Sequence, residues 1–286
     1  MSAHKALSDR EYHFTLRDFE KVRKLIREHA GITLNDGKQD MVYSRIARRI
    51  RAKKLETFND YLQQLESDPV EWEEFVNSLT TNLTSFFREG YHFPILADFL
   101  KQHRGKRIRL WCSAASTGEE PYSMAITAIE ALGPNPMVEI IATDIDTKVL
   151  TEAESGVYSF ERVKRLQTEK LSYFLKGTGN NAGKVKVRPE VKNLVTFKQL
   201  NLLSPQWDVQ GPFDAIFCRN VLIYFDRPTQ RQIVEKFSPL LAPNGLLFIG
   251  HSENLASDKD LYTLRGQTVY ESRRYRDAKE RKVHAA

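Results

Sequence analysis

Two consecutive glutamates, Glu119 and Glu120, follow a run of small residues in the segment "WCSAASTGEEPYS". The run lies where a predicted buried strand, "RIRLWCSA", gives way to a predicted helix. Small residues let the backbone approach a ligand closely, as glycines do in dinucleotide-binding folds. Two acids at the helix start would repel a phosphate by roughly 1 to 4 kcal/mol each. The pattern therefore favours a ligand with positive charge, and the alternative is that both acids only complement the helix dipole.

A further acid ends the next predicted strand, in "VEIIATDID". Asp144 is placed there to accept hydrogen bonds from the two hydroxyls of a ribose, whereas Asp146 is expected to cap the following helix. A nucleoside with a cationic end and no phosphates would suit both acidic positions, and S-adenosylmethionine is such a ligand. An ordinary turn acid at a strand end is the alternative for Asp144.

Polar residues also end the strand predicted within "FDAIFCRNVLIYF". Arg219 and Asn220 are costly to bury without partners, so their position at the carboxyl end of a strand indicates a ligand contact. Tyr224 follows within reach of the same mouth, and a core tyrosine with a surface hydroxyl is the alternative. His251, in "HSEN", is expected to be structural.

A sheet must position these motifs. Strand and helix patterns alternate after Pro94, which predicts βαβ units and a largely parallel sheet, with a helix over 227–245 before the last strand. Such sheets bind ligands at the carboxyl ends of their strands. The Gly-rich and Asn-rich segment 176–193, which contains "KVKVR", predicts a small antiparallel hairpin inserted into this α/β domain.

Residues 16–78 have a different character, because they show amphipathic helical patterns and no strand signal. This part is predicted to be a small helical bundle, and Gly31 is a plausible stop for its first helix. Basic side chains fan across one helix of the bundle; they are Arg45, Arg48, Arg49, Arg51 and Lys53. They suit an acidic partner, and a solvated helix face is the alternative.

The composition is that of an ordinary globular protein of 286 residues, with 41% hydrophobic residues and a formal net charge of +6. The charge permits an acidic partner without choosing among nucleic acid, lipid and protein. Cys112 and Cys218 are the only cysteines and neither lies in a C-x-x-C pair, so neither a disulfide framework nor a metal site is indicated. The polar start and the short apolar runs predict a cytoplasmic protein without a membrane span.

One stretch between the two halves, "LTTNLTSFFRE", is too polar for a core helix and too aromatic for an ordinary linker. A linker with Phe86 and Phe87 as plugs would explain the aromatic residues. It would not explain Asn82, Thr84 and Arg88, which recur beside them at helical or turn spacing.

Five segments together resemble the CheR family of chemotaxis receptor methyltransferases, in the family's order, over about residues 16–272. They are "LTTNLTSFFRE", "AASTGEEPYS", "ATDIDTKVL", "GPFDAIFCRNVLIYF" and "GLLFIGHSENL". The resemblance implies a Rossmann-like class I methyltransferase domain behind a small all-α domain. It further implies S-adenosylmethionine as cofactor, S-adenosylhomocysteine as product, and glutamate side chains on the cytoplasmic helices of chemoreceptors as substrate.

Site residues are also implied position by position. The implied cofactor contacts are Asn82, Thr84, Arg88, Glu120, Asp144, Asn201, Leu202, Arg219 and Asn220. Arg88 and Tyr224 are implied at the reacting centre. The inserted hairpin resembles the family's tethering subdomain, which in some members binds a receptor C-terminal pentapeptide by strand addition. The matching positions are Gly177, Gly179, Lys186 and Arg188, and the basic helix would face acidic receptor residues.

The resulting division of the chain has six parts. They are a flexible start (1–15), the helical domain (16–78), a linker that contributes to the cofactor site (79–93), the methyltransferase domain (94–275) with a β-subdomain inserted at about 158–195, and a flexible tail (276–286). A monomer is expected. Two rival functions are a nucleic-acid methyltransferase, which would show salt-dependent binding, and a catalytically silent scaffold that binds cofactor and docks on receptors.

Overall fold

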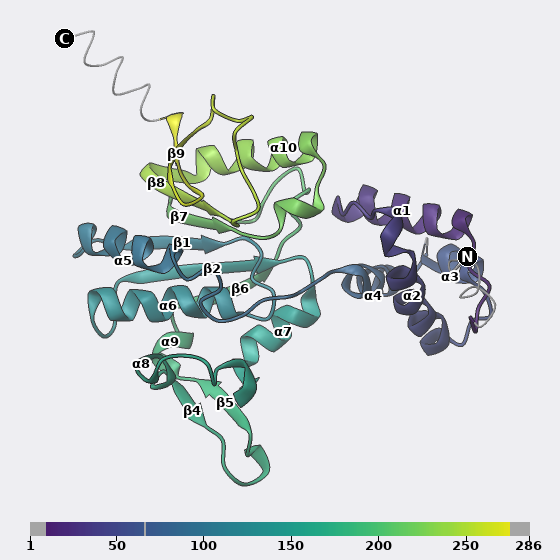
Figure 1. Cartoon of the computed structure of the whole chain (residues 1–286), viewed down its shortest axis with the longest axis horizontal. Helices are drawn as coiled ribbons and strands as arrows, with labels where there is room; N and C mark the ends of the chain where they lie inside the picture. Colours follow the sequence, from purple (N-terminus) through teal and green to yellow (C-terminus); the bar gives the residue numbers. More distant parts are fainter. Residues whose placement is uncertain (1–9, 66, 275–286) are drawn as a thin grey trace, which may run out of the picture. The chain divides into compact units, whose positions relative to one another are not determined.

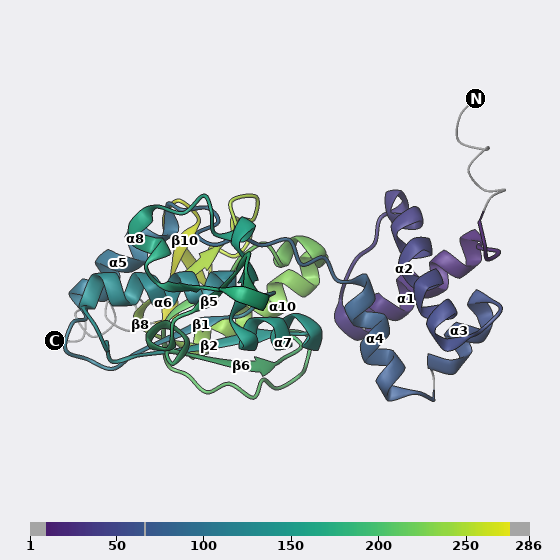
Figure 2. The same cartoon turned by 90° about the horizontal axis from the view of Figure 1, so that it is seen from below.

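A computed structural model describes residues 10–65 and 67–274 of the chain (Figures 1 and 2). The chain divides into two compact units. A helical unit runs to Thr81 and also includes Tyr224–Asp226, and a sheet unit comprises Asn82–Ile223 and the chain from Arg227 on. The tail predicted at 276–286 lies outside the described residues, as do residues 1–9 of the predicted flexible start. No helix in the described ranges is long and apolar enough to cross a membrane.

The helical unit contains four α-helices that pack through apolar faces. They are α1 (Leu16–Ala30), α2 (Gln39–Lys53), α3 (Phe58–Leu65) and α4 (Pro69–Leu79). Thr15 and Asp18 form a reciprocal capping box at the start of α1, and Gly31 ends it at φ 69°, as predicted. Within the predicted flexible start, Phe14 is buried against the ring of Phe58, so the chain is already packed there.

The sheet unit is built on a seven-stranded sheet in the order β6-β2-β1-β7-β8-β10-β9. The strands are β1 (Ile108–Cys112), β2 (Val138–Asp144), β6 (Val195–Gln199), β7 (Phe213–Cys218), β8 (Leu241–Ile249), β9 (Tyr262–Gly266) and β10 (Val269–Ser272). The pairs from β6 to β8 are parallel, and β10 pairs antiparallel with both β8 and β9. The carboxyl ends of β1, β2 and β7 therefore meet at one edge of the sheet.

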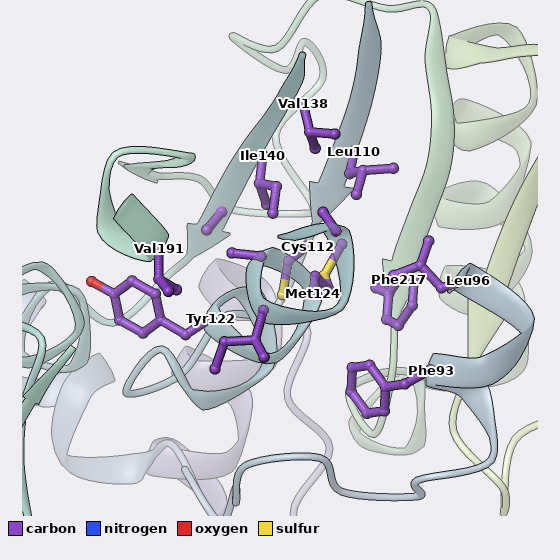
Figure 3. Close-up of a cluster of buried hydrophobic side chains, with 14 of the residues drawn as sticks. Phe93, Leu96, Leu110, Cys112, Tyr122, Met124, Val138, Ile140, Val191 and Phe217 are labelled. Atoms are coloured by element: carbon purple, nitrogen blue, oxygen red, sulfur yellow. The ribbon is translucent and has the colours of Figure 1, made fainter. Parts of the chain in front are cut away.

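Helices pack on this sheet and bury its core. They include α5 (His92–Gln102), α6 (Glu119–Leu132), α7 (Thr147–Ser155), α9 (Pro189–Lys192) and α10 (Arg227–Phe237). Figure 3 shows core side chains from the first strands meeting Phe93 of α5 and Met124 of α6, with Phe217 of β7 beside them. The prediction of a helix over 227–245 was too long. α10 ends at Phe237, and the following residues form a short 3-10 helix and then enter β8, because Pro239 cannot donate a helical hydrogen bond.

A small three-stranded antiparallel sheet is inserted after α7. Its strands are β3 (Val157–Ser159), β4 (Phe174–Lys176) and β5 (Lys184–Val187), in the order β3-β5-β4. The predicted hairpin corresponds to β4 and β5, and β3 adds a strand that the pattern did not predict. Gly177 is required in the turn, because a Cβ there would lie 2.1 Å from the carbonyl oxygen of Asn181. Residues 157–187, which carry these three strands, are called the β-subdomain below.

Candidate active site at the carboxyl ends of the strands

Asp144 closes β2 with its side chain buried, and both carboxylate oxygens accept backbone N–H groups. Oδ2 accepts from Ser116 at 2.8 Å, and Oδ1 accepts from Asp146 at 3.0 Å. Burial raises the pKa of Asp144 to about 6. Asp146 caps α7 as predicted, through Lys148 and Val149, and its other oxygen accepts from Asn82 Nδ2 at 2.8 Å. Asn82 therefore joins the linker to the end of β2.

Glu120, at the second position of α6, is buried between two partners. Its Oε1 lies 3.3 Å from the Cys112 thiol, which donates to it, and its Oε2 lies 2.7 Å from Arg219 Nη1. Burial raises the pKa of Glu120, while the charge of Arg219 opposes the rise. The neighbouring Glu119 is also buried, and it pairs with Arg162 Nη2 at 3.2 Å. Each of the two glutamates thus pairs with a different arginine, so neither only complements the dipole of α6.

Arg219 and Asn220 share one acceptor that was not singled out from the sequence, Glu89. Glu89 lies 3.1 Å from Arg219 Nη2, and it accepts hydrogen bonds from Asn220 Nδ2 at 2.9 Å and from both the backbone N–H and the ring of His251. Burial would raise the pKa of Glu89, but these hydrogen bonds and the charge of Arg219 lower it to about 2. Glu89 therefore ties the linker to the ends of β7 and β8.

Glu253 is a second acceptor that the motifs did not reveal. It is buried and accepts from the backbone N–H groups of Asn220 at 2.9 Å and Gly250 at 2.6 Å. A Cβ at Gly250 would lie 2.5 Å from Asn220 Nδ2, so only glycine fits there. One signal that was not used could have led to both acids: buried Arg219 and Asn220 need acceptors, and "FFRE" and "HSEN" each carry a glutamate.

Residues 80–91 of the linker lie in irregular chain and turns rather than in a helix. Arg88 donates through Nη1 to the Leu83 carbonyl at 2.7 Å, and its own carbonyl accepts from Arg219 Nη2 at 2.6 Å. Thr84 is half-buried. Phe86 packs edge-on against Tyr158 and Phe174 of the β-subdomain, each at 5.1 Å between ring centroids.

Several non-glycine residues around this edge adopt positive φ. They are Phe87 (54°), Glu89 (51°), Ser116 (49°) and Asn220 (58°). Left-handed backbone at non-glycine residues is costly and clusters at functional sites, where the surrounding contacts hold it. Here the contacts of Glu89 and Asp144 hold the linker and the β1–α6 loop in these conformations.

The other implied cofactor residues follow β6 at the same edge. Asn201 Oδ1 accepts from the Leu203 N–H at 2.9 Å, and Leu202 is buried. Tyr224 belongs to the helical unit, where its hydroxyl lies 3.4 Å from the Thr81 carbonyl. Adjacency in the sequence suggested that Tyr224 lies with Arg219, whereas the contacts of Tyr224 group it with the helical unit.

The basic residues of α2 divide into different roles. Arg49 forms a two-point pair with buried Glu71, at 2.9 and 2.8 Å, and also pairs with Glu74. Arg45 donates to the carbonyls of Ser78 and Thr80, and Arg51 pairs with Glu11. Arg48 is exposed, and its Nε contacts a carbonyl of its own helix, that of Ser44, at 3.4 Å. Arg49 thus serves the fold of the bundle, whereas Arg48 and Arg51 are both exposed.

The implied peptide-binding positions lie in and beside the β-subdomain. Lys186 projects from β5, opposite Val157 and Leu175, and is exposed. Arg188 donates through Nε to the Ser172 carbonyl at 2.6 Å. Gly177 and Gly179 form the turn after β4, with Gly179 at φ 56°. β4 is an edge strand of the small sheet, because it pairs with β5 on one side and ends the strand order on the other.

The polar groups at the edge of the main sheet fit the cofactor suggested by the sequence. A carboxylate has about four lone-pair positions, so Asp144 can accept ribose hydroxyls in addition to its two backbone donors. Glu120 offers a carboxylate to an ammonium group. The buried Nε of Arg219 has no hydrogen-bond partner among the described residues, and such an orphan donor suits a ligand acceptor. Within residues 10–65 and 67–274, no group of three or more His, Cys, Asp or Glu side chains is arranged to hold a metal ion.

Comparisons with known proteins identify the family of this chain. Residues 17–80 match the model of the "CheR methyltransferase, all-alpha domain", and residues 82–271 match that of the "CheR methyltransferase, SAM binding domain". A chemotaxis protein methyltransferase of Escherichia coli is 54% identical over 256 residues, which cover 88% of this chain and 89% of the relative. Chemotaxis protein methyltransferase 2 of Pseudomonas aeruginosa is 50% identical over 266 residues, which cover 92% and 95%.

These matches and the two sheets confirm the predicted fold class, a Rossmann-like class I methyltransferase domain with an inserted antiparallel sheet, preceded by an all-α domain. The family matches extend over both units of the chain and include the carboxyl ends of β1, β2, β6, β7 and β8. The chain therefore belongs to the CheR methyltransferase family.

Proposed function

We propose that this chain transfers a methyl group from S-adenosylmethionine to glutamate side chains on the cytoplasmic helices of chemoreceptors, forming glutamyl methyl esters. The family membership and the names of the relatives support the reaction class. The observation that carries the proposal is the charged chain Glu120–Arg219–Glu89, next to Asp144 at the carboxyl edge of the sheet. A substrate on the cytoplasmic helices of receptors would place the protein in the cytoplasm; we further propose that it acts as a monomer and not on nucleic acid.

Each polar group at the edge has a proposed part in holding the cofactor. Asp144 and Asn201 would bind the nucleoside, and Glu120 and Arg219 would bind the ammonium and carboxylate of the amino-acid end. When bound, S-adenosylmethionine supplies an electrophilic methyl group on a sulfonium. Asn82 and Thr84 would cover the nucleoside from the linker, which explains why that stretch is polar as well as aromatic. Leu202 and Asn220 would complete the pocket.

The substrate needs orientation rather than activation. A glutamate carboxylate has a reference pKa of about 4.3 and is ionised at neutral pH, so no general base is needed. Water solvates that carboxylate and weakens it as a nucleophile. The protein's part is to desolvate it and to align the reacting atoms at about 3 to 3.5 Å.

Arg88 and Tyr224 are the residues proposed to align it. A guanidinium carries five N–H donors, and Arg88 spends one on the Leu83 carbonyl, so it has others for a carboxylate. Too tight an arginine pair would hold the nucleophilic oxygen back, and Arg88 should therefore orient the carboxylate without neutralising it. The Tyr224 hydroxyl would add one hydrogen bond.

Receptor recognition is proposed to use both units. Arg45, Arg48 and Arg51 of α2 would meet acidic residues of the receptor helices, each exposed pair contributing about 0.2 to 1 kcal/mol, which favours register more than affinity. Arg49 is occupied by Glu71 and is assigned a smaller part. A receptor C-terminal pentapeptide would add a strand to the β-subdomain, near Gly177, Gly179, Lys186 and Arg188.

Incubation of the purified chain with methyl-labelled S-adenosylmethionine and receptor-enriched membranes tests the proposal. We expect label on the receptor that is released as methanol in mild base, since esters hydrolyse and N-methyl groups do not. Arg88→Ala and Tyr224→Phe should each lower kcat by about 10-fold or more, as expected when a group that orients or stabilises the reacting atoms is lost. Arg107→Ala, a change of an exposed arginine, is the matched control.

Unchanged turnover in both variants would refute the roles of Arg88 and Tyr224. Cofactor binding without transfer to any receptor would instead favour the silent scaffold, and label on nucleic acid would favour the other rival.

A further inference from the structure

The β-subdomain does more than present strands, because two of its side chains contact the loop between β1 and α6. This loop, residues 113–118, together with Glu119 and Glu120, is called the cofactor loop below. Tyr158 lies in β3, and Arg162 ends the short 3-10 helix that follows it. Both side chains reach the cofactor loop, which is about 40 residues earlier in the chain.

Arg162 compensates a charge that has no access to water. Glu119 is 0% exposed, at the first turn of α6. Its Oε2 accepts from Thr117 Oγ1 at 2.7 Å, while its Oε1 has no hydrogen-bond donor among the described residues and faces Arg162 Nη2 at 3.2 Å. Arg162 also donates to Glu152 of α7 at 2.8 Å, which holds the guanidinium in place.

Tyr158 fixes the backbone of the same loop. Its hydroxyl donates to the Thr117 carbonyl at 2.6 Å, and the side chain is buried. Gly118 follows at φ 95°, and a Cβ there would lie 2.8 Å from both the Tyr158 hydroxyl and the Ala153 side chain. The loop is therefore clamped between the β-subdomain and α7, with no room to shift toward either.

We propose that Arg162 and Tyr158 are positioning residues for the cofactor, acting through the cofactor loop, so that the β-subdomain sets cofactor affinity in addition to any part in receptor binding. This inference rests on the proposed use of Glu120 at the cofactor. Glu119 and Glu120 are adjacent in the first turn of α6, so a movement of Glu119 toward water must rotate Glu120 away from Arg219. Substitution of Arg162 or Tyr158 would not alter Arg88 or Tyr224, the residues proposed at the reacting centre.

Calorimetry with S-adenosylhomocysteine on the full chain tests the proposal, together with initial rates at varied cofactor. Arg162→Met should raise the Kd by about 10-fold or more, because a buried acceptor loses its compensating charge. Arg162→Lys should restore part of the affinity. Tyr158→Phe, which removes one hydrogen bond, should raise the Kd by about 3- to 10-fold. In each variant the KM for cofactor should rise while kcat at saturating cofactor stays near the wild-type value.

The second-site variant Glu119→Gln separates positioning from folding. In Arg162→Met/Glu119→Gln the buried side chain at position 119 is neutral and needs no compensating charge, so we expect the Kd to return to within about 3-fold of that of Glu119→Gln alone. Arg165→Met, a change of an exposed arginine in the same segment, is the control and should bind normally. A Kd unchanged in both Arg162→Met and Tyr158→Phe, or a loss of kcat and thermal stability without a change in Kd, would overturn the inference. If the wild type itself fails to bind S-adenosylhomocysteine, the proposed function fails instead.

Discussion

Glu89 offers the sharpest test of how the site is held together, through the substitution Glu89→Gln. The amide keeps the size of the side chain but removes the charge that faces Arg219 and two of the acceptor positions used by Asn220 and His251. Each pKa unit corresponds to about 1.4 kcal/mol, so lowering the pKa of Glu89 from 4.5 to about 2 sets an upper limit of about 3.5 kcal/mol. Solvent screening at the rim of the site reduces this, and we expect about 1 to 2 kcal/mol at pH 7.

Urea unfolding followed by tryptophan fluorescence measures this loss of unfolding free energy in the sheet unit. Trp111 and Trp207 lie together in the sheet unit, with ring centroids 5.3 Å apart, and report its unfolding. In a parallel thermal unfolding experiment, we expect the melting temperature of a unit of this size to fall by about 2 to 8 °C. Glu161→Gln, a change of an exposed glutamate in a surface ion pair, is the matched control and should stay within about 0.5 kcal/mol of wild type.

The pH dependence has a defined sign. Because the pKa of Glu89 is lower in the folded protein, its contribution is complete above the unfolded-state value of about 4.5 and is lost as pH falls toward 2. The difference in unfolding free energy between wild type and Glu89→Gln should therefore be constant from about pH 6 to 8 and narrow below about pH 4.5. Equal urea midpoints at neutral pH, or a difference that widens in acid, would show that Glu89 does not organise the site as described.

Three further outcomes are expected. Gly250→Ala should destabilise the sheet unit by about 1 to 3 kcal/mol in urea unfolding, because its Cβ would lie 2.5 Å from Asn220 Nδ2. Glu71→Gln should destabilise the helical unit by about 2 to 3 kcal/mol, read from its tryptophan signal, since it breaks the buried pair with Arg49. The affinity of the wild type for S-adenosylhomocysteine should rise from pH 5 to 7, because Asp144, whose pKa is raised to about 6, ionises in this range. Asp144→Asn should bind more weakly and show no such rise in affinity. Titration calorimetry across this pH range measures both effects.

Local patterns were enough to predict most of the elements. Alternating strand and helix patterns predicted the parallel part of the sheet, and Gly31 marked the end of the first helix through a backbone preference that depends on few neighbours. The helix expected over 227–245 was wrong at its end, because apolar residues after a proline suit a short 3-10 turn and a buried strand as well as a helix. The strand β3 was missed because three residues carry too little periodicity to predict a strand.

Residue types at strand ends indicated where the polar chemistry gathers, but not which groups pair. Glu119 and Glu120 look equivalent in the sequence, yet one faces Arg162 and the other Arg219, since consecutive helix positions point about 100° apart. Glu89 was passed over beside Arg88, because nothing local marks an acid whose partners lie more than 100 residues away. The arginines of α2 looked alike in the sequence, as basic side chains that fan across one helix, and only the packing of α4 assigned Arg49 to Glu71.

The sequence by itself determined the division into a helical and an α/β part, the family, and the polar character of the strand ends, because periodicity, capping residues and long motifs are local properties of the chain. Tertiary structure alone decided the partners: which acid each arginine compensates, which glutamate joins the linker to the sheet, and how the β-subdomain holds the cofactor loop. Ion pairs and buried hydrogen bonds depend on distances between segments far apart in the chain, and only the folded packing sets those distances.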